Sequence, residues 1–158
     1  ARADVTERNP DQTSLPAHVE ALTQVVEVWQ ALGASTYRPF YWCVLGQLLT
    51  AAKQPDQARA RLDGALRFTA DTGVRFYDAE LLRARAHTQS DAKARADDLA
   101  AARQLARRQG ARLFELRASI DDLDGRGKPA RQNLLDAVAR MPNGSRIPEL
   151  TRARALLQ

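Results

Sequence analysis

The only cysteine, Cys43, is the first candidate for chemistry in this sequence, because a thiolate can act as a nucleophile or a metal ligand. It lies in the stretch YWCVLGQLL, residues 41–49, which otherwise reads as a helix. A reactive cysteine needs a histidine or a cluster of cations to lower its pKa, and no such group is recognisable beside it. We therefore expect Cys43 to be a packing residue.

The histidines and the adjacent acidic residues form no catalytic or metal-binding pattern. His18 and His87 lie 69 residues apart, and neither has a second ligand three or four positions along a helix. The Asp-Asp pairs at 97–98 and 121–122 point about 100° apart on a helix, which is poor geometry for shared acid–base work. We interpret these pairs as solvated faces. We expect no catalytic residue, no metal, no cofactor and no enzymatic activity.

The segment DGRGKP, residues 124–129, superficially resembles a phosphate-binding loop. Such a loop reads GxxxxGK followed by Ser or Thr, whose hydroxyl binds Mg²⁺. Here Asp122 stands where the first glycine should be, Pro129 replaces the hydroxyl residue, and no strand precedes the segment. We interpret it as a turn between helices.

The composition is that of one folded domain. Hydrophobic residues make up 44% and charged residues 27% of the 158 residues, which is typical of globular proteins and enough for a hydrophobic core. No apolar run approaches the roughly 18 residues of a membrane span, and the start of the chain lacks a signal-peptide pattern. A single cysteine fits a reducing compartment. We expect a cytoplasmic protein without membrane contact.

The formal net charge is +5, from 24 Lys and Arg against 19 Asp and Glu. A basic excess can indicate nucleic-acid binding, and Arg107, Arg108, Arg112 and Arg117 motivate that alternative. The arginines, however, alternate with Asp, Glu and Ala, whereas a footprint on phosphates requires clustered cations. A nucleic-acid-binding helical domain is therefore the second hypothesis and not the first.

Start and stop signals divide the chain into about eight helical segments. Strand signals, meaning period-two runs of β-branched residues between hairpin turns, are nearly absent. The expected helices cover about residues 16–32, 39–53, 55–72, 74–88, 91–109, 111–123, 130–140 and 148–157. We predict an all-α fold with a polar N-terminal extension over residues 1–14 and a helical-repeat domain over residues 15–158.

An internal repeat organises these helices. The segment TGVRFYDAELLRA, which starts at residue 72, matches QGARLFELRASID, which starts at residue 109, at an offset of 37 residues. Helix pairs that repeat every 34 to 40 residues or so indicate a solenoid of stacked antiparallel hairpins. We predict a right-handed α-solenoid.

The second and third expected helices carry the clearest packing signal, because small and apolar residues recur on one face of each at helical spacing. Antiparallel helices approach closely only where small residues face each other, so we expect Gly46 and Ala58 at the crossing. Trp42 and Leu62 would fill the space on either side. Close packing would explain a mid-helix glycine, which costs about 1 kcal/mol relative to alanine. The residues expected to pack the repeats are Trp42, Leu45, Gly46, Leu49, Ala58, Leu62, Ala65, Gly73, Leu99, Ala102 and Gly110.

The pattern W-x-x-L-G-x-x-(apolar) at residues 42–49, followed by A-x-x-x-(apolar)-x-x-A at residues 58–65, resembles the tetratricopeptide repeat. Stretches at residues 53–58, 70–86, 106–118 and 148–157 resemble the C-terminal helical-repeat region of large bacterial signalling proteins. In that family a STAND-type AAA ATPase accompanies an adenylate cyclase-like domain or a DNA-binding domain such as that of LuxR-type regulators. The resemblance implies that this chain is the repeat region and that the catalytic domains of the parent protein lie upstream.

A repeat region of this kind acts by binding. By tetratricopeptide geometry, the first helix of each pair lines a concave groove that can hold a peptide segment. The expected groove-binding residues are Phe40, Gln47, Glu80, Arg83, His87 and Arg117. We expect the partner to be another protein or other domains of the same chain, and the sequence leaves open whether the groove binds a peptide or a small molecule. Exposed end repeats can also self-associate, because solenoid ends need polar caps.

Aromatic residues gather at the starts of successive helices. They are Tyr37, Phe40, Tyr41, Phe76, Tyr77 and Phe114. We interpret them as core between neighbouring repeats, with the alternative that some of them line the groove.

Overall fold

The computed structural model describes residues 14–33, 36–123 and 127–158, and within these ranges the chain is all-α, with eight helices and no strand. The helices are α1 (Leu15–Ala31), α2 (Arg38–Ala51), α3 (Pro55–Thr72), α4 (Asp78–Ala86), α5 (Ala92–Arg108), α6 (Arg112–Asp122), α7 (Gly127–Ala139) and α8 (Pro148–Leu156). The all-α prediction is confirmed. The expected extension over residues 1–14 lies, apart from Ser14, outside the described residues, as do residues 124–126 of the expected turn.

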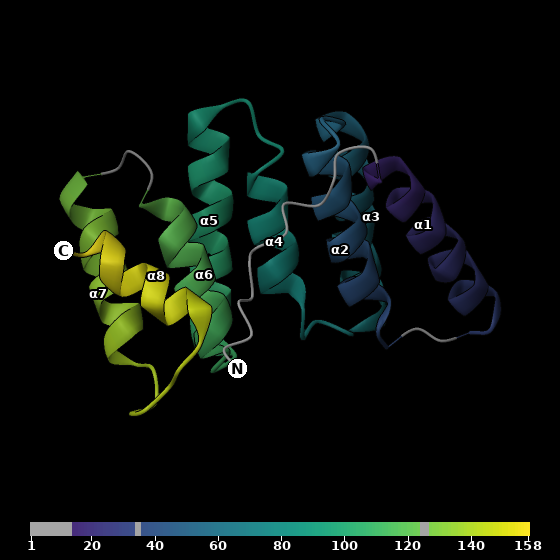
Figure 1. Ribbon diagram of the computed structural model, residues 1–158. Coiled ribbons are helices and arrows are strands. Elements are labelled where there is room, and N and C mark those ends of the chain that lie inside the picture. Colours follow the sequence, from purple (N-terminus) through teal and green to yellow (C-terminus); the bar gives the residue numbers. More distant parts are fainter. Residues whose placement is uncertain (1–13, 34–35, 124–126) are drawn as a thin grey trace, which may run out of the picture.

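The helices are arranged side by side in chain order, with α1 at one end and α7 and α8 at the other (Figure 1). Each helix packs against the next one along the chain. The even-numbered helices also contact one another, α2 with α4, α4 with α6, and α6 with α8, whereas within the described ranges no contact joins α3 to α5 or α5 to α7. We call α2, α4, α6 and α8 the inner layer and α3, α5 and α7 the outer layer. These contacts are those expected of stacked helix pairs, and the predicted right-handed solenoid stays a prediction.

Local sequence explains where most helices begin and end. A proline stands at the first or second position of α2, α3 and α8, where its missing N–H is not needed. The Asp91 carboxylate caps α5 by accepting hydrogen bonds from the backbone N–H groups of Lys93 and Ala94. Gly73 ends α3 at φ +75°, a left-handed conformation that an L side chain strains.

Helix α4 is shorter than the sequence predicts. The expected segment begins near Val74, whereas the helix begins at Asp78 and ends at Ala86. The reason is a turn after Gly73, in which the backbone N–H of Asp78 donates to the carbonyl of Arg75 over 3.2 Å. The Arg75 side chain closes the same turn through an ion pair of 3.0 Å with the Asp78 carboxylate.

The core is a series of clusters between neighbouring helices. The first joins α1 to α2 and α3 and contains Leu45, Leu49, Ala58, Val19 and Leu22. The second joins α2, α3 and α4 and contains Cys43, Leu62, Ala65, Leu81 and Ala84, with Trp42 packed against it. The third joins α6, α7 and α8 around Leu116, Ile120, Leu134, Ala137, Leu150 and Ala153. Leu99 and Ala102 of α5 are also buried. Burial of these side chains, at roughly 25 cal/mol per Å² of apolar surface, is the main force that holds the stack together.

Helices α2 and α3 come closest at Gly46. A Cβ atom placed on Gly46 would lie 2.7 Å from one Leu62 methyl and 2.8 Å from Leu62 Cγ, distances that real Cβ atoms do not show. Leu62 itself is fully buried. Leu62, which the sequence placed to one side of the crossing, lies directly over Gly46 and therefore requires the glycine. Ala58, the partner expected at the crossing, is fully buried and packs with Leu45 and Leu49 of α2.

We predict that Gly46→Ala destabilises the protein even though alanine favours a helix. The gain in helix propensity is about 1 kcal/mol, whereas forcing a methyl group into the buried Leu62 side chain costs about 1–3 kcal/mol. The free energy of unfolding in urea should therefore fall, by about 1 kcal/mol.

The matched control is Gly64→Ala in α3, where a Cβ would meet only the end of the Arg67 side chain at 3.8 Å. That variant should gain up to about 1 kcal/mol. If both glycine variants were stabilised, the close approach at Gly46 would not be a constraint on the fold.

Candidate functional site

Charged side chains from three inner-layer helices meet in one network. Arg83 of α4 binds Glu80 on the same helix and Asp121 of α6, at 3.0 Å and 2.8 Å. Arg117 of α6 binds Glu149 of α8 at 2.6 Å and also reaches Glu80 at 3.4 Å. His87, which follows the last turn of α4, places Nε2 2.7 Å from the Asp121 carboxylate. We call these six residues the inner-layer charge network.

Burial makes the network electrostatically strong. The Glu80 side chain is only 1% exposed, while the side chains of Arg83 and Asp121 are 15% and 13% exposed. Burial alone would lower the pKa of Arg83, but the charges of Glu80 and Asp121 raise it above its ordinary value. Burial alone would raise the pKa of Asp121, but His87 and Arg83 lower it. The charge on Asp121 therefore contributes stability above the ordinary aspartate pKa of about 3.9, and this contribution is lost as the pH falls.

The ion pairs of the acidic residues correct the interpretation of Asp97–Asp98 and Asp121–Asp122 as solvated faces. Of the four aspartates, only Asp97 is well exposed, and it pairs with Lys93 at the surface. Asp98 is buried and binds Arg85 and Gln89, and Asp122 is buried and binds Arg103. Each aspartate that faces away from solvent has an arginine partner, because an unpaired buried carboxylate is too costly to desolvate.

Four of the six expected groove residues, namely Glu80, Arg83, His87 and Arg117, belong to this network. Sequence reasoning missed Asp121 and Glu149, which complete it. A signal for one contact was present: Glu80 and Arg117 carry opposite charges at equivalent positions of the 37-residue repeat, which places them side by side on adjacent inner helices. The Glu80 side chain is too deeply buried to contact a partner, so its role is to hold the two arginines.

The other expected groove residues lie beside the network. Gln47 of α2 and His87 are exposed, and they line a hollow of about 340 Å³ between α2 and α4 together with Thr50, Ala51 and Ala84. The alanines give the hollow an apolar floor, and Gln47 and His87 supply polar groups at its rim. Phe40, at the start of α2, is 39% exposed.

Aromatic rings connect the repeats near the starts of the inner helices. Phe40 contacts Tyr41 and Tyr77 edge to face, and Tyr77 contacts Phe114 of α6 in the same way, with ring centroids 5.3–5.5 Å apart. Such pairs contribute about 0.5–1.5 kcal/mol beyond the area that they bury. Phe40 and Tyr77 therefore connect α2, α4 and α6, as predicted for core between repeats, while Phe40 also presents part of its ring to solvent. Tyr37 and Phe76 are 60% and 46% exposed, so the interpretation of these two residues as core is wrong.

Cys43 lies directly beneath the network, in the core. It is 1% exposed, its Sγ donates to the carbonyl of Glu80 over 3.6 Å, and it accepts from Gln47 Nε2 over the same distance. Burial and the nearby negative charge of Glu80 raise the pKa of the thiol to about 12, against the opposing charges of Arg83 and Arg117. At neutral pH the thiol is therefore protonated, which fits a packing residue.

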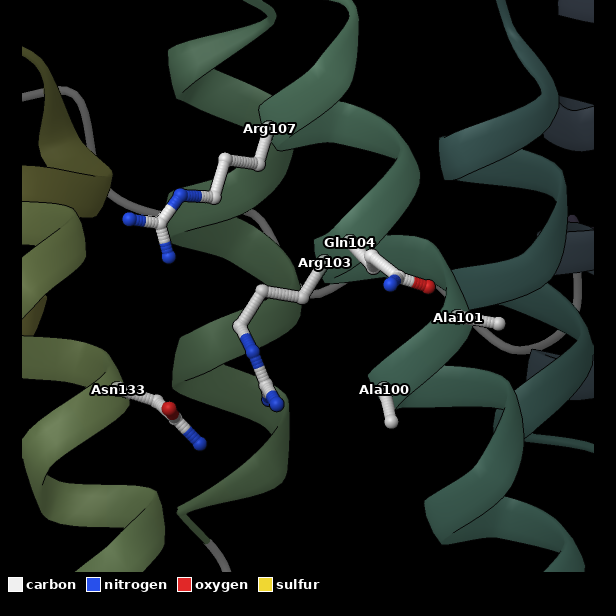
Figure 2. A pocket seen from close by; sticks show the side chains of 6 residues that line it. All are labelled: Ala100, Ala101, Arg103, Gln104, Arg107 and Asn133. Atoms are coloured by element: carbon white, nitrogen blue, oxygen red, sulfur yellow. The ribbon is translucent and has the colours of Figure 1, made fainter.

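The arginines that motivated the nucleic-acid hypothesis do not form one patch. Arg117 is engaged in the inner layer, whereas Arg107 lies on the outer face. Figure 2 shows Arg103 and Arg107 extending from α5 into a cleft of about 510 Å³ toward Asn133 of α7. Arg103 is bound to Asp122 at 2.9 Å in this cleft. The pairing of Arg103 with Asp122 therefore reduces the net positive charge beside Arg107.

The described ranges contain neither a metal-binding cluster nor a helix that could span a membrane. No group of three or more His, Cys, Asp or Glu residues in the described ranges is arranged to hold a metal ion. Across the same ranges, no helix is both long enough and apolar enough to cross a membrane.

Comparisons of the chain with protein-family models, with curated proteins and with solved structures found no match.

We predict that Cys43 resists alkylation in the folded protein. A buried thiol with a pKa near 12 offers almost no thiolate at pH 8. Iodoacetamide labelling followed by intact mass should show little modification in buffer and complete modification in urea. Rapid labelling of the folded chain would contradict the buried position and reopen the question of a reactive thiol.

We predict that Arg83→Met destabilises the protein strongly, because it leaves the buried Glu80 and Asp121 carboxylates without their main cation. Removing one member of a buried pair costs about 3–5 kcal/mol, and the remaining contact from Arg117 places the expected loss near the lower end, about 3 kcal/mol. The free energy of unfolding in urea, compared between the variant and the unsubstituted chain, measures this loss.

The control is Lys93→Met, which breaks a surface pair whose side chains are 82% and 64% exposed. Exposed pairs contribute little, so the change should stay below about 1 kcal/mol. Equal effects of the two methionine substitutions would show that the network is no stronger than a surface ion pair.

Proposed function

We propose that this chain is a non-catalytic helical-repeat module that binds a segment of a protein partner, or a small ligand, on its inner layer. The observation that supports this most is the hollow of about 340 Å³ between α2 and α4, next to a fixed charge network. Ligand sites are concave, mostly apolar and edged by a few polar groups, with volumes of about 300–1,000 Å³. The hollow lies at the small end of that range and suits one side chain of a bound segment.

The charge network supports binding rather than catalysis. Its carboxylates and guanidinium groups are already paired with one another, so none is left as a free acid, base or nucleophile. Pairing holds the inner helices at fixed distances, and this pre-organisation lowers the cost of binding. His87 within the network, and Gln47 and Phe40 outside it, remain exposed to contact a partner.

We place this module in a larger bacterial signal-transduction ATPase or transcriptional regulator. The support is the resemblance of residues 70–86 and 106–118 to the repeat regions of such proteins. In that setting the partner is another domain of the same polypeptide or a second protein whose binding regulates the catalytic domains.

Nucleic-acid binding is the second candidate, and the arginine-lined cleft between α5 and α7 is the feature that favours it. Its support is weaker, because Arg103 and Arg117 are held by carboxylates of the chain itself. Affinity for phosphates grows with the number of cations that are free to replace counterions. We therefore rank this candidate below peptide binding.

We predict that Gln47→Trp blocks the inner-layer site, because the indole fills the hollow that Gln47 lines. The experiment is selection of peptides from a displayed random library on the purified chain, followed by affinity measurement. The selected peptides should bind Gln47→Trp at least about tenfold more weakly, a loss of 1.4 kcal/mol or so.

The matched control is Gln104→Trp, since Gln104 is also exposed but lines the cleft on the outer face. It should bind the peptides as the unsubstituted chain does, and circular dichroism should show both variants folded. Failure to select any peptide, or equal binding by the two variants, would count against the proposed site.

A further inference from the structure

Helix α1 carries an apolar face that no other part of the described chain covers. Its exposed apolar residues include Val25, Val28, Trp29 and Leu32, which are 41%, 57%, 37% and 77% exposed. Together with His18 and Ala21, they form a stripe in which residues 18, 21, 25, 28 and 32 follow at alternating spacings of three and four and Trp29 lies beside Val28. This is the pattern of a helix that packs along another helix. The adjacent side of α1 already packs on α2 and α3 through Val19 and Leu22, and Leu22 lies at the border between the two faces.

Comparison with α3 shows what kind of element fits this face. Gly33 and Gly73 end α1 and α3, and a shift of 40 residues aligns the two helices. It places His18, Leu22, Val25 and Trp29 on Ala58, Leu62, Ala65 and Thr69. All four α3 residues are fully buried, and α2 covers this face through Cys43, Leu45 and Gly46. The equivalent face of α1 is therefore shaped to receive a helix.

The two halves of the exposed α1 face differ in shape, and this difference indicates which partner fits the face. Its N-terminal half borders a shallow, open hollow of about 520 Å³ lined by His18, Ala21, Leu22, Val25 and Leu48. Its C-terminal half bears the exposed Val28 and Leu32, beside Trp29, whose ring packs on Tyr41 of α2. A projection and a hollow on one helix complement each other when two copies of that helix lie antiparallel about a two-fold axis perpendicular to them, because the same surface then meets itself.

We propose that this face joins two copies of the chain through antiparallel α1 helices, with the two-fold axis near Val25. In that arrangement Leu32 of one copy lies opposite His18 of the other, and Trp29 lies opposite Ala21. The carboxylates of α1, Glu20 and Glu27, fall outside the stripe, so like charges do not meet across the interface. The proposal does not depend on peptide binding, because the inner-layer hollow lies between α2 and α4.

Sedimentation equilibrium of the chain over a range of concentrations tests the proposal. We expect a reversible dimer, and we expect Val25→Glu to weaken it more than about tenfold, because the substitution buries a charge at the centre of the interface. Leu135→Glu on α7 is the control, since Leu135 is 42% exposed and Val25 is 41% exposed. Circular dichroism reports whether each variant is folded.

Cysteine cross-linking tests the orientation. A mixture of Leu32→Cys and His18→Cys chains should form disulfide-linked dimers under mild oxidation, whereas Leu32→Cys alone should not, because the two copies of residue 32 lie at opposite ends of the interface. Dimers linked through residue 32 in both copies would overturn the antiparallel arrangement. The proposed interface would be overturned if the chain sedimented as a monomer at every concentration. It would also be overturned if Leu135→Glu weakened the dimer as much as Val25→Glu does. In either case the α1 face would be left to a helix of another protein.

Discussion

The close approach of antiparallel helices is the constraint on which the remainder of the structure depends. At Gly46 the α2 backbone comes so near to α3 that a single methyl group would overlap the Leu62 side chain. Because α2 and α3 lie this close, Cys43, Leu62 and Ala65 reach α4 and form one cluster with Leu81 and Ala84. The contact therefore holds α2 against α3 and also positions α4, the first helix of the next pair.

The spacing of the inner layer in turn decides how its charges are arranged. Helices α4, α6 and α8 lie near enough for Arg83 and Arg117 to span neighbouring repeats and bind carboxylates on both sides. A buried carboxylate such as Glu80 is tolerated only because two guanidinium groups surround it. The inner-layer charge network therefore requires the same spacing between repeats as the apolar core does. It also adds geometric specificity, because each ion pair forms only when its two helices lie at the right distance and rotation.

The same arrangement explains why side chains of the inner layer that could be reactive are buried or paired. The thiol of Cys43 and the carboxylates of Glu80 and Asp121 all lie near one another, yet the thiol is buried and protonated and the carboxylates are paired. What remains open on this layer is the hollow beside Gln47 and His87. The apolar stripe of α1 forms a second surface, so the proposed binding site and the proposed interface between two copies lie on different helices.

The all-α class, most helix boundaries and the packing role of Cys43 follow from sequence patterns alone, because helical periodicity, prolines, glycines and caps act locally. The repeat also places Glu80 and Arg117 in register. Tertiary contacts set three further features: α4 starts at Asp78, Leu62 lies above Gly46, and Asp98, Asp121 and Asp122 are paired rather than solvated. These outcomes depend on the distance and rotation between helices far apart in the chain, and the pattern along a single helix does not contain that information.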